Sequence, residues 1–530
     1  MSTTKELDNL LKSASVTRRN FMGRAAALGV STAIASSMWS GSAHAAKPKK
    51  GGRLRLGLGG GSTTDSLDTA TLPDFMAQQL SMGQLRNCLV EIDADGKPVP
   101  ELAESWESSP DAKEWSFKLR KGVEFHNGKT MDADDVIHSI NHHRGEKSKS
   151  AAKSIVKSIV EMKADGKDRV TFKLDSGSAD FPFVASDYHL GIVPAGTTGK
   201  DMEKGMGTGA YVLESHEPGV RAFAKRNPNY WKEGRAHFDE VETISIADVN
   251  ARTNALKTGE VDFINRAEAK TFHLLKRLPG VVAIKTTGTK HYTIPMRSDM
   301  APYNNNDARL ALKYGIDREA VVKTVLRGHG LIGNDHPIAP SNQYFNKDLP
   351  VRKYDADKAK FHLKKAGLED HTFNLHASDA AFGGAVDTAV LYQEQAAKAG
   401  LKIKVVREPK DGYWDNVWMK KEWTFSFWSG RPTEDWMFTI GYAAGGSWNE
   451  SFWSNKRFNE LLVSARAELD TTKRREMYYE MQQLCRDDGG SVIPMFASDL
   501  AGATYKLKHN KIAANWEGDG MKISERWWFG

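Results

Sequence analysis

The sequence FWSGRPTEDWMF, Phe427–Phe438, predicts a strand, a turn and the start of a helix in direct succession. Phe425 and Phe427 alternate with polar residues, which is the period of a strand with one buried face. Gly430–Pro432 then favours a turn. Thr433 is a suitable N-cap, and the two acidic residues after it are favourable in a first helical turn. A strand that ends in a loop and a helix N-terminus is a common setting for a small-molecule site.

Tryptophans are concentrated around this turn. Half of the chain's 14 tryptophans lie between Tyr413 and Trp453, at positions 414, 418, 423, 428, 436, 448 and 453. We expect Trp423, Trp448 and Trp453 to be core residues. The other indoles exceed what packing needs, so the turn at Arg431 is interpreted as one wall of a ligand-binding cleft.

Residues 1–45 have the features of an export signal. Thr17–Met22 contains a twin-arginine pair, and a mildly apolar segment, Ala25–Trp39, follows it. Ala43–Ala45 then fits the rule for cleavage before Ala46. We therefore expect transport by the twin-arginine translocase and a mature protein free in the periplasm.

The charge of the mature chain is nearly neutral. The signal holds five basic and two acidic residues, so its removal lowers the formal charge from +7 to +4. That balance gives no reason to propose nucleic-acid binding. No other apolar run is long enough to span a bilayer. We expect a monomer of two or three lobes with an ample core.

Two cysteines are present, Cys88 and Cys485. Cys485 shares a helical face with Met477 and Met481, which is typical of a core residue. An oxidising compartment permits a disulfide between the two cysteines, but sequence alone leaves the pairing open. No His or Asn pattern supports a catalytic thiol.

Strands and helices alternate along the rest of the chain, which favours α/β lobes. Helices are predicted from about residue 132 and over 249–259, 307–326 and 355–367. Strands at 373–375 and 403–406 flank a further helix at 386–399.

Several long blocks resemble family 5 of the solute-binding proteins of ABC importers, the dipeptide, oligopeptide and nickel-binding group. They are LVEIDADGKPVPELAESWE (89–107), WSFKLRKGVEFHNGK (115–129), GTGAY (207–211), RNPNYW (226–231), APYNNNDARLALKYGIDRE (301–319) and the segment around Trp428. The blocks cover almost the whole mature chain and follow the order of the family.

The resemblance implies a bilobed periplasmic binding protein of type II, cluster C, with three domains and a ligand cleft between the lobes. The main domain of lobe 1 is expected to comprise residues 46–88, 180–297 and 490–530, with an extra domain at 89–179. Lobe 2 is expected to be 298–489. The implied partners are the permease subunits of an ABC importer and a small-molecule ligand.

Within this resemblance, one residue suggests that the ligand differs from that of the peptide-binding members. Peptide-binding members commonly carry an aspartate at the position of Arg431, where it pairs with the peptide's ammonium. A guanidinium repels an ammonium and instead clamps a carboxylate, so we expect an anionic or zwitterionic ligand. Asp435 or Glu434 remains a possible ammonium acceptor. The expected ligand-binding residues are Tyr292, Arg297, Tyr413, Trp414, Trp428, Arg431, Asp435 and Trp436.

Two alternatives remain open. A nickel-chelate or haem binder belongs to the same family, although no motif for either ligand is present. A metalloenzyme would need clustered ligands, and His138, His142 and His143 with Asp134 or Asp135 are the nearest approach. We favour the simpler interpretation, an exposed helix face with incidental histidines. We expect no enzymatic activity and no cofactor.

Overall fold

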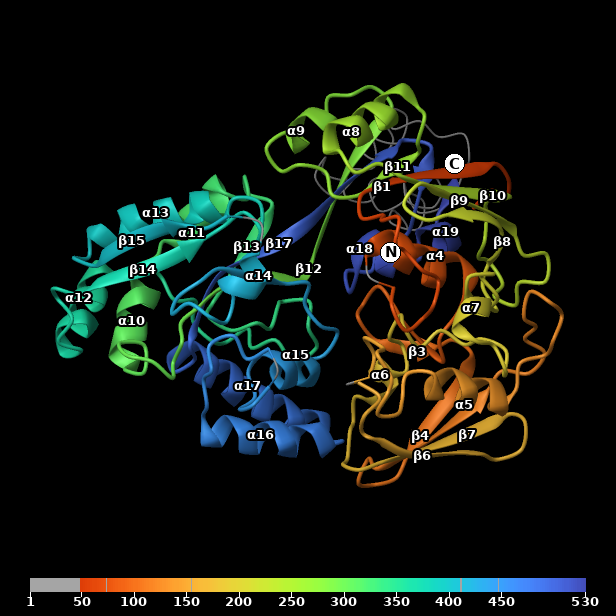
Figure 1. Ribbon diagram of the computed structural model, residues 1–530, viewed down its shortest axis with the longest axis horizontal. Coiled ribbons are helices and arrows are strands. Elements are labelled where there is room, and N and C mark those ends of the chain that lie inside the picture. Colours follow the sequence, from red (N-terminus) through yellow and green to blue (C-terminus); the bar gives the residue numbers. More distant parts are fainter. Residues whose placement is uncertain (1–47, 73, 154, 410–411, 447) are drawn as a thin grey trace, which may run out of the picture.

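The computed structural model describes residues 48–530, apart from residues 73, 154, 410–411 and 447. The predicted signal peptide, residues 1–45, therefore lies outside the described residues. The remaining chain forms two lobes joined by strands that run through both (Figure 1).

A nine-stranded sheet connects the lobes, with the order β16-β12-β17-β11-β1-β10-β9-β8 and with β13 paired to β17. Its strands are β1 (Arg53–Leu58), β8 (Tyr211–Glu217), β9 (Arg221–Arg226), β10 (Glu240–Ser245), β11 (Phe263–Ile264), β12 (Val281–Pro295), β13 (Gly330–Ile332), β16 (Ser426–Trp428) and β17 (Ser491–Thr504).

The long antiparallel pair β12 and β17 is the crossing point between the lobes. Residues Val281–Thr287 pair with one half of β17, on the side that carries β11 and β1. After a shift of register, His291–Pro295 pair with the other half, beside β13 and β16. An irregular ladder bends locally and loses hydrogen bonds, so this point is suited to a change of angle between the lobes.

Lobe 1 contains the β1 side of this sheet and a second, four-stranded sheet, β4-β5-β7-β6, which is covered by α5. Its further elements are β2 (Val90–Ile92), β3 (Pro98–Pro100), β4 (Ala103–Ser108), β5 (Glu114–Leu119), β6 (Ile159–Ala164), β7 (Arg169–Leu174), β18 (Leu507–Lys508), β19 (Trp528–Phe529), α4 (Phe75–Leu80), η1 (Ser81–Leu85), α5 (Ala133–Asn141), α6 (Phe181–Val184), α7 (Gly199–Met202), α8 (Val249–Thr258), α9 (Phe272–Leu275), α18 (Glu517–Gly520) and α19 (Ile523–Arg526).

Lobe 2 has two adjoining cores, one around the parallel pair β14-β15 and one among α15, α16 and α17. Its elements besides β13 and β16 are β14 (Thr372–Ala377), β15 (Lys402–Arg407), α10 (Asn306–Tyr314), α11 (Arg318–Thr324), α12 (Ala356–Lys365), α13 (Ala385–Ala397), α14 (Tyr413–Asn416), α15 (Glu434–Gly441), α16 (Lys456–Ala467) and α17 (Thr471–Asp487).

Local signals placed most helices correctly. Asp132 caps α5, Asp355 caps α12, and Gly259 ends α8 in the left-handed conformation that favours glycine. The single helix predicted over 307–326 is wrong, because the chain leaves the helix at Gly315 and Asp317 caps a second one.

Both cysteines are free and buried. Cys88 belongs to the core of lobe 1 and Cys485 to a core of lobe 2, so no disulfide joins them. The domain boundaries at residues 88, 179, 297 and 489 remain a prediction. Within the described part of the chain, no helix has the length and apolar character needed to cross a bilayer.

Candidate ligand-binding site

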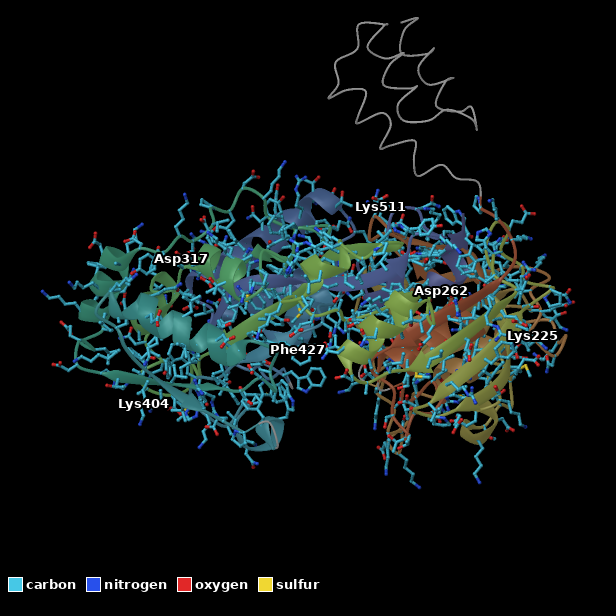
Figure 2. All side chains as sticks on the ribbon, turned by 90° about the horizontal axis from the view of Figure 1, so that it is seen from above. Lys225, Asp262, Asp317, Lys404, Phe427 and Lys511 are labelled. Carbon is cyan, nitrogen blue, oxygen red and sulfur yellow. The ribbon has the colours of Figure 1, made fainter. Side chains whose placement is uncertain are left out.

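A cavity of about 1120 Å³ lies between the lobes, beside the crossing strands. Lobe 1 contributes Asp187, Tyr188 and Trp516 to its wall, and lobe 2 contributes the segment from Ser426 to Pro432. Seen from above, Phe427 lies between the two lobes (Figure 2). The cavity is large enough for a small organic solute.

The turn predicted at Gly430 forms this wall. β16 pairs with β12 and ends at Trp428, and Thr433 caps α15 by accepting a hydrogen bond from the amide of Trp436. Gly430 has φ +84°, and a Cβ there would lie 2.0 Å from Thr289 Oγ1 on the crossing strand. Only glycine fits both demands, so close packing holds the next residue, Arg431, at the cavity.

Arg431 has no carboxylate partner among the described residues. Its Nη1 donates to the carbonyl of Gly430 at 2.7 Å. Its guanidinium carbon lies 5.5 Å from the ring centroid of Trp428 and 5.9 Å from that of Trp436. Burial lowers the pKa of Arg431, an effect that Tyr188 and Asp187 partly oppose. A partly desolvated cation between two indoles is a favourable site for an anion.

The other arginine and lysine side chains on the described cavity wall, Arg266 and Lys290, already have carboxylate partners. Arg266 contacts Asp74 at 2.8 Å and Glu517 at 2.9 Å. Lys290 lies 3.3 Å from Asp499. An anionic group entering the cavity would therefore find Arg431 unoccupied, whereas the other two cations would have to exchange partners.

Aromatic side chains cover much of the remaining wall. Tyr292 stacks on Phe382 with ring centroids 3.7 Å apart, and Trp414 packs edge-on against Phe427. Trp423 and Trp453 are core residues, as expected. The expectation for Trp448 is wrong, because 46% of it is exposed and it lines the cavity beside Trp428.

Five of the eight expected ligand-binding residues line this cavity: Tyr292, Trp414, Trp428, Arg431 and Trp436. The structure does not bring Tyr413, Arg297 or Asp435 to it.

The three expected residues that do not line the cavity have other partners. The hydroxyl of buried Tyr413 donates to the carbonyl of Phe425 at 2.8 Å. Arg297 contacts Asp299 at 2.6 Å and lies over a phenylalanine ring. Asp435 contacts Arg466 of α16 at 3.1 Å. Glu434, the other expected ammonium acceptor, is buried and accepts from the amide of Tyr344.

Sequence reasoning missed several residues of the wall. Asp187, Tyr188 and Trp516 come from segments of lobe 1 that are far from the turn in sequence. Glu450 lies 22 residues after Trp428, whose indole donates to it at 3.1 Å. These positions share no motif, so only the tertiary structure could unite them.

The three histidines considered for a metalloenzyme site each contact a different partner in the structure. His138 lies 2.9 Å from the carbonyl of Thr197, and His142 lies 2.6 Å from Asp68. His143 contacts Ser150. The three imidazoles thus serve local packing and do not converge on one point.

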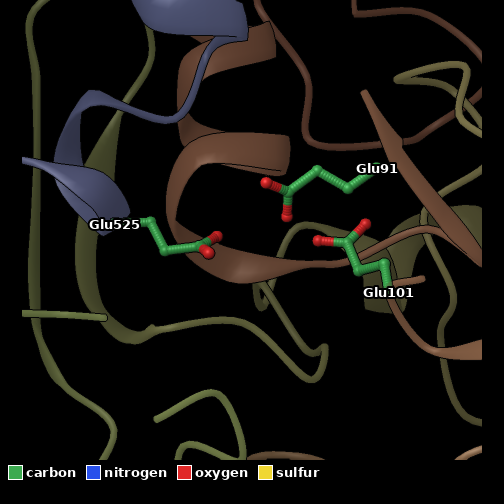
Figure 3. A group of neighbouring side chains, drawn as sticks. All are labelled: Glu91, Glu101 and Glu525. Carbon is green, nitrogen blue, oxygen red and sulfur yellow. The ribbon is translucent and has the colours of Figure 1, made fainter. Parts of the chain in front are cut away.

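One carboxylate group with metal-type spacing occurs in the described chain, formed by Glu91, Glu101 and Glu525 (Figure 3). Lys232 forms ion pairs with all three, at 2.6 Å to Glu101 and 3.1 Å to Glu525, and Lys522 adds a contact at 2.9 Å to Glu101. Arg526 lies 2.6 Å from Glu91 and supplies a third positive charge, so the three carboxylates are already balanced and the cluster is a buried ion-pair network within lobe 1.

Known proteins are similar over most of this chain. The dipeptide-binding protein of Escherichia coli (strain K12) is 27% identical over 513 residues, covering 84% of this chain and 93% of that protein. The glutathione-binding protein GsiB of Pectobacterium atrosepticum is 26% identical, covering 80% of this chain and 84% of that protein.

Among solved structures, the PBP AgaA in complex with agropinic acid from A. tumefaciens R10 has a TM-score of 0.74 and 25% identity, covering 90% of this chain and 99% of that one. Residues 97–450 match the family described as bacterial extracellular solute-binding proteins, family 5, middle. The fold is accordingly the bilobed α/β fold of type II periplasmic binding proteins. The chain belongs to the bacterial extracellular solute-binding proteins, family 5.

Proposed function

We propose that this protein is the substrate-binding component of an ABC importer. It captures a peptide or peptide-like small molecule that carries a carboxylate or another anionic group, and it delivers this ligand to the permease. Arg431 is the observation that carries the proposal, because it is the cation on the cavity wall that lacks a carboxylate partner in the described chain.

The surroundings of Arg431 favour an anion over the ammonium of a peptide. Trp428 and Trp436 restrict water around the guanidinium, which strengthens a charge-assisted hydrogen bond to a carboxylate. Like charges at about 4 Å repel by several kcal/mol at intermediate dielectric. An ammonium is therefore disfavoured at this position, and a planar carboxylate matches the guanidinium fork.

The cellular setting follows from the sequence and the family. The twin-arginine pair and the cleavage motif within residues 1–45 support export by the twin-arginine translocase to the periplasm. Both lobes of the monomer would then dock on the permease. Among the described residues that line the cavity, no group of histidines converges to hold a nickel chelate or haem. His189 lies on this wall, and its imidazole is 2.7 Å from the carboxylate of Asp187.

Isolation of the protein from its own periplasm under native conditions tests this proposal. Mass spectrometry of the released small molecules should identify a compound with a carboxylate or similar anion. Deletion of the gene should abolish cellular uptake of that compound without removing an enzymatic activity on it. Uptake that continues unchanged in the deletion strain would contradict the proposal.

A further inference from the structure

Glu450 is a buried carboxylate on the cavity wall, and uncharged donors surround it. The indole of Trp418 donates to Oε1 at 2.7 Å, and the indole of Trp428 donates to Oε2 at 3.1 Å. The hydroxyl of Thr293 also donates to Oε2, at 3.0 Å. No lysine, arginine or histidine among the described residues lies within ion-pair distance of it.

Burying a charge without a counter-ion is costly. Burial accordingly raises the pKa of Glu450, while its hydroxyl and indole donors oppose that rise. The side chain of Ser426 is a further donor, so neutral groups supply the roughly four hydrogen bonds that a carboxylate can accept. These donors leave the carboxylate without a counter-ion, and a cationic group of a ligand would remove the cost of that buried charge.

The aromatic surroundings suit a cation as well. Trp448 packs beside Trp428 with ring centroids 5.9 Å apart, and Trp418 packs edge-on against Trp414. All of these residues and Glu450 line the same cavity. Indole rings attract cations through their negative faces, and rings gathered around a carboxylate also exclude water.

Trp428 links this carboxylate to the anion site. Its Nε1 is bonded to Glu450, and its ring lies 5.5 Å from the guanidinium carbon of Arg431. The cavity therefore presents a carboxylate and a guanidinium that both contact the same indole. A ligand that satisfies both must carry two opposite charges.

We infer that Glu450, with the indoles of Trp418, Trp428 and Trp448, forms a subsite for an ammonium or guanidinium group. The ligand is a zwitterion whose carboxylate is held by Arg431 and whose cationic group is held by Glu450. This inference rests on the proposed solute-binding function. Glu450 thereby replaces Asp435 and Glu434 as the expected ammonium acceptor, because those two residues have other partners.

Two simple probes test the two charged sites separately. Tetramethylammonium probes Glu450, with tert-butanol as its neutral equivalent in shape, and glutarate probes Arg431. Saturation-transfer NMR titrations would be run on the folded wild type, Glu450→Gln, Trp448→Leu and Arg431→Ala. Glu460→Gln, on the exposed face of α16, is the control for loss of one carboxylate.

Glu450→Gln should weaken tetramethylammonium binding by about tenfold or more, the equivalent of about 1.4 kcal/mol, and leave tert-butanol unchanged. Trp448→Leu, at a position that is about half exposed, should also weaken tetramethylammonium binding, which guards against a local folding defect in Glu450→Gln. No binding of tetramethylammonium to the wild type, or equal binding to Glu450→Gln, would overturn the subsite. Glutarate binding that is lost in Arg431→Ala but kept in Glu450→Gln preserves the proposed function in that event. Equal glutarate binding to wild type and Arg431→Ala would count against the proposed function instead.

Discussion

The guanidinium of Arg474 on α17 lies 2.8 Å from the carboxylate of Asp180, at the start of α6 in the other lobe. Both side chains are buried, and a backbone hydrogen bond from Ala179 to the carbonyl of Arg466 lies beside them. In the view of Figure 1, α17 and α6 lie below the crossing strands β12 and β17. It joins the lobes directly, so it stabilises the closed arrangement.

Arg474→Met should therefore shift the ligand-free protein towards an open form. Loss of one partner leaves Asp180 as an uncompensated buried charge, which opening would rehydrate. Small-angle scattering should show a larger radius of gyration, and ligand affinity should fall. Arg457→Met removes an exposed ion pair between α16 and α17, within lobe 2, and should leave the radius unchanged. An unchanged radius for both variants would contradict the role of Arg474.

Lys232→Met should destabilise lobe 1 strongly. The ammonium contacts three carboxylates that are nearly inaccessible to solvent, and removal of one partner from such a network costs about 3–5 kcal/mol. Urea unfolding followed by circular dichroism measures the change. Lys225→Met removes an exposed pair with Glu214 and should cost only about 0–1 kcal/mol. Similar costs for the two variants would show that the buried network is not stabilising.

The pH dependence of stability should carry a signature of Glu434. Burial raises its pKa to about 7, from an ordinary value of 4.5, and the nearby Asp180 adds to the rise while Arg474 opposes it. A raised carboxyl pKa contributes stability that is fully present below about pH 4.5 and is lost as the pH rises through 7.

Glu434→Gln keeps the oxygen that accepts from Tyr344 and cannot ionise. The variant should match the wild type near pH 4.5 and exceed its unfolding free energy at pH 8 by up to about 3 kcal/mol. Chemical unfolding at both pH values tests this. A variant that is less stable than the wild type at pH 8 would show that the Glu434 carboxylate is favourable when charged.

Gly430→Ala should weaken ligand binding through Arg431. The new Cβ would meet Thr289 Oγ1 at 2.0 Å at a backbone angle that alanine disfavours, a strain of about 1–3 kcal/mol. Gly445→Ala is the matched control, since Gly445 also has a positive φ but no atom within 4 Å of the added carbon. Calorimetric titration with the natural solute compares them. Equal affinities for the two variants would show that the turn does not position Arg431.

Local sequence signals predicted the turn and its flanking elements, because each depends on neighbouring residues. The strand before the turn and the capping role of Thr433 depend on a few neighbouring positions, and both are confirmed. The expected buried face of the strand is wrong, because Ser426 and Trp428 are buried whereas Phe427 is 40% exposed. The site also depends on contacts without a sequence period. Asp435 was expected at the ligand, but its partner Arg466 lies 31 residues away. Glu450 reaches the cavity only because the chain returns to Trp428 after α15.

Charge was the most useful signal for the ligand. Arg431 was expected at the ligand because of its charge, and the structure places it on the cavity wall near two indoles. The opposite charge at Glu450 could not be assigned from sequence, since a glutamate in a Trp-rich loop has many possible partners. Its burial and its neutral donors became visible only in three dimensions.

The most direct test of this account is calorimetric titration of the solute recovered from the periplasm into the wild type, Arg431→Ala and Arg431→Lys. Arg431→Ala should lose about 2–5 kcal/mol of binding free energy, as expected for truncation of one partner of a buried charged pair. Arg431→Lys should recover only part of that loss, because an ammonium cannot reproduce the planar fork. Equal affinity of the wild type and Arg431→Ala for the solute would contradict the claim that this cleft recognises an anion through Arg431.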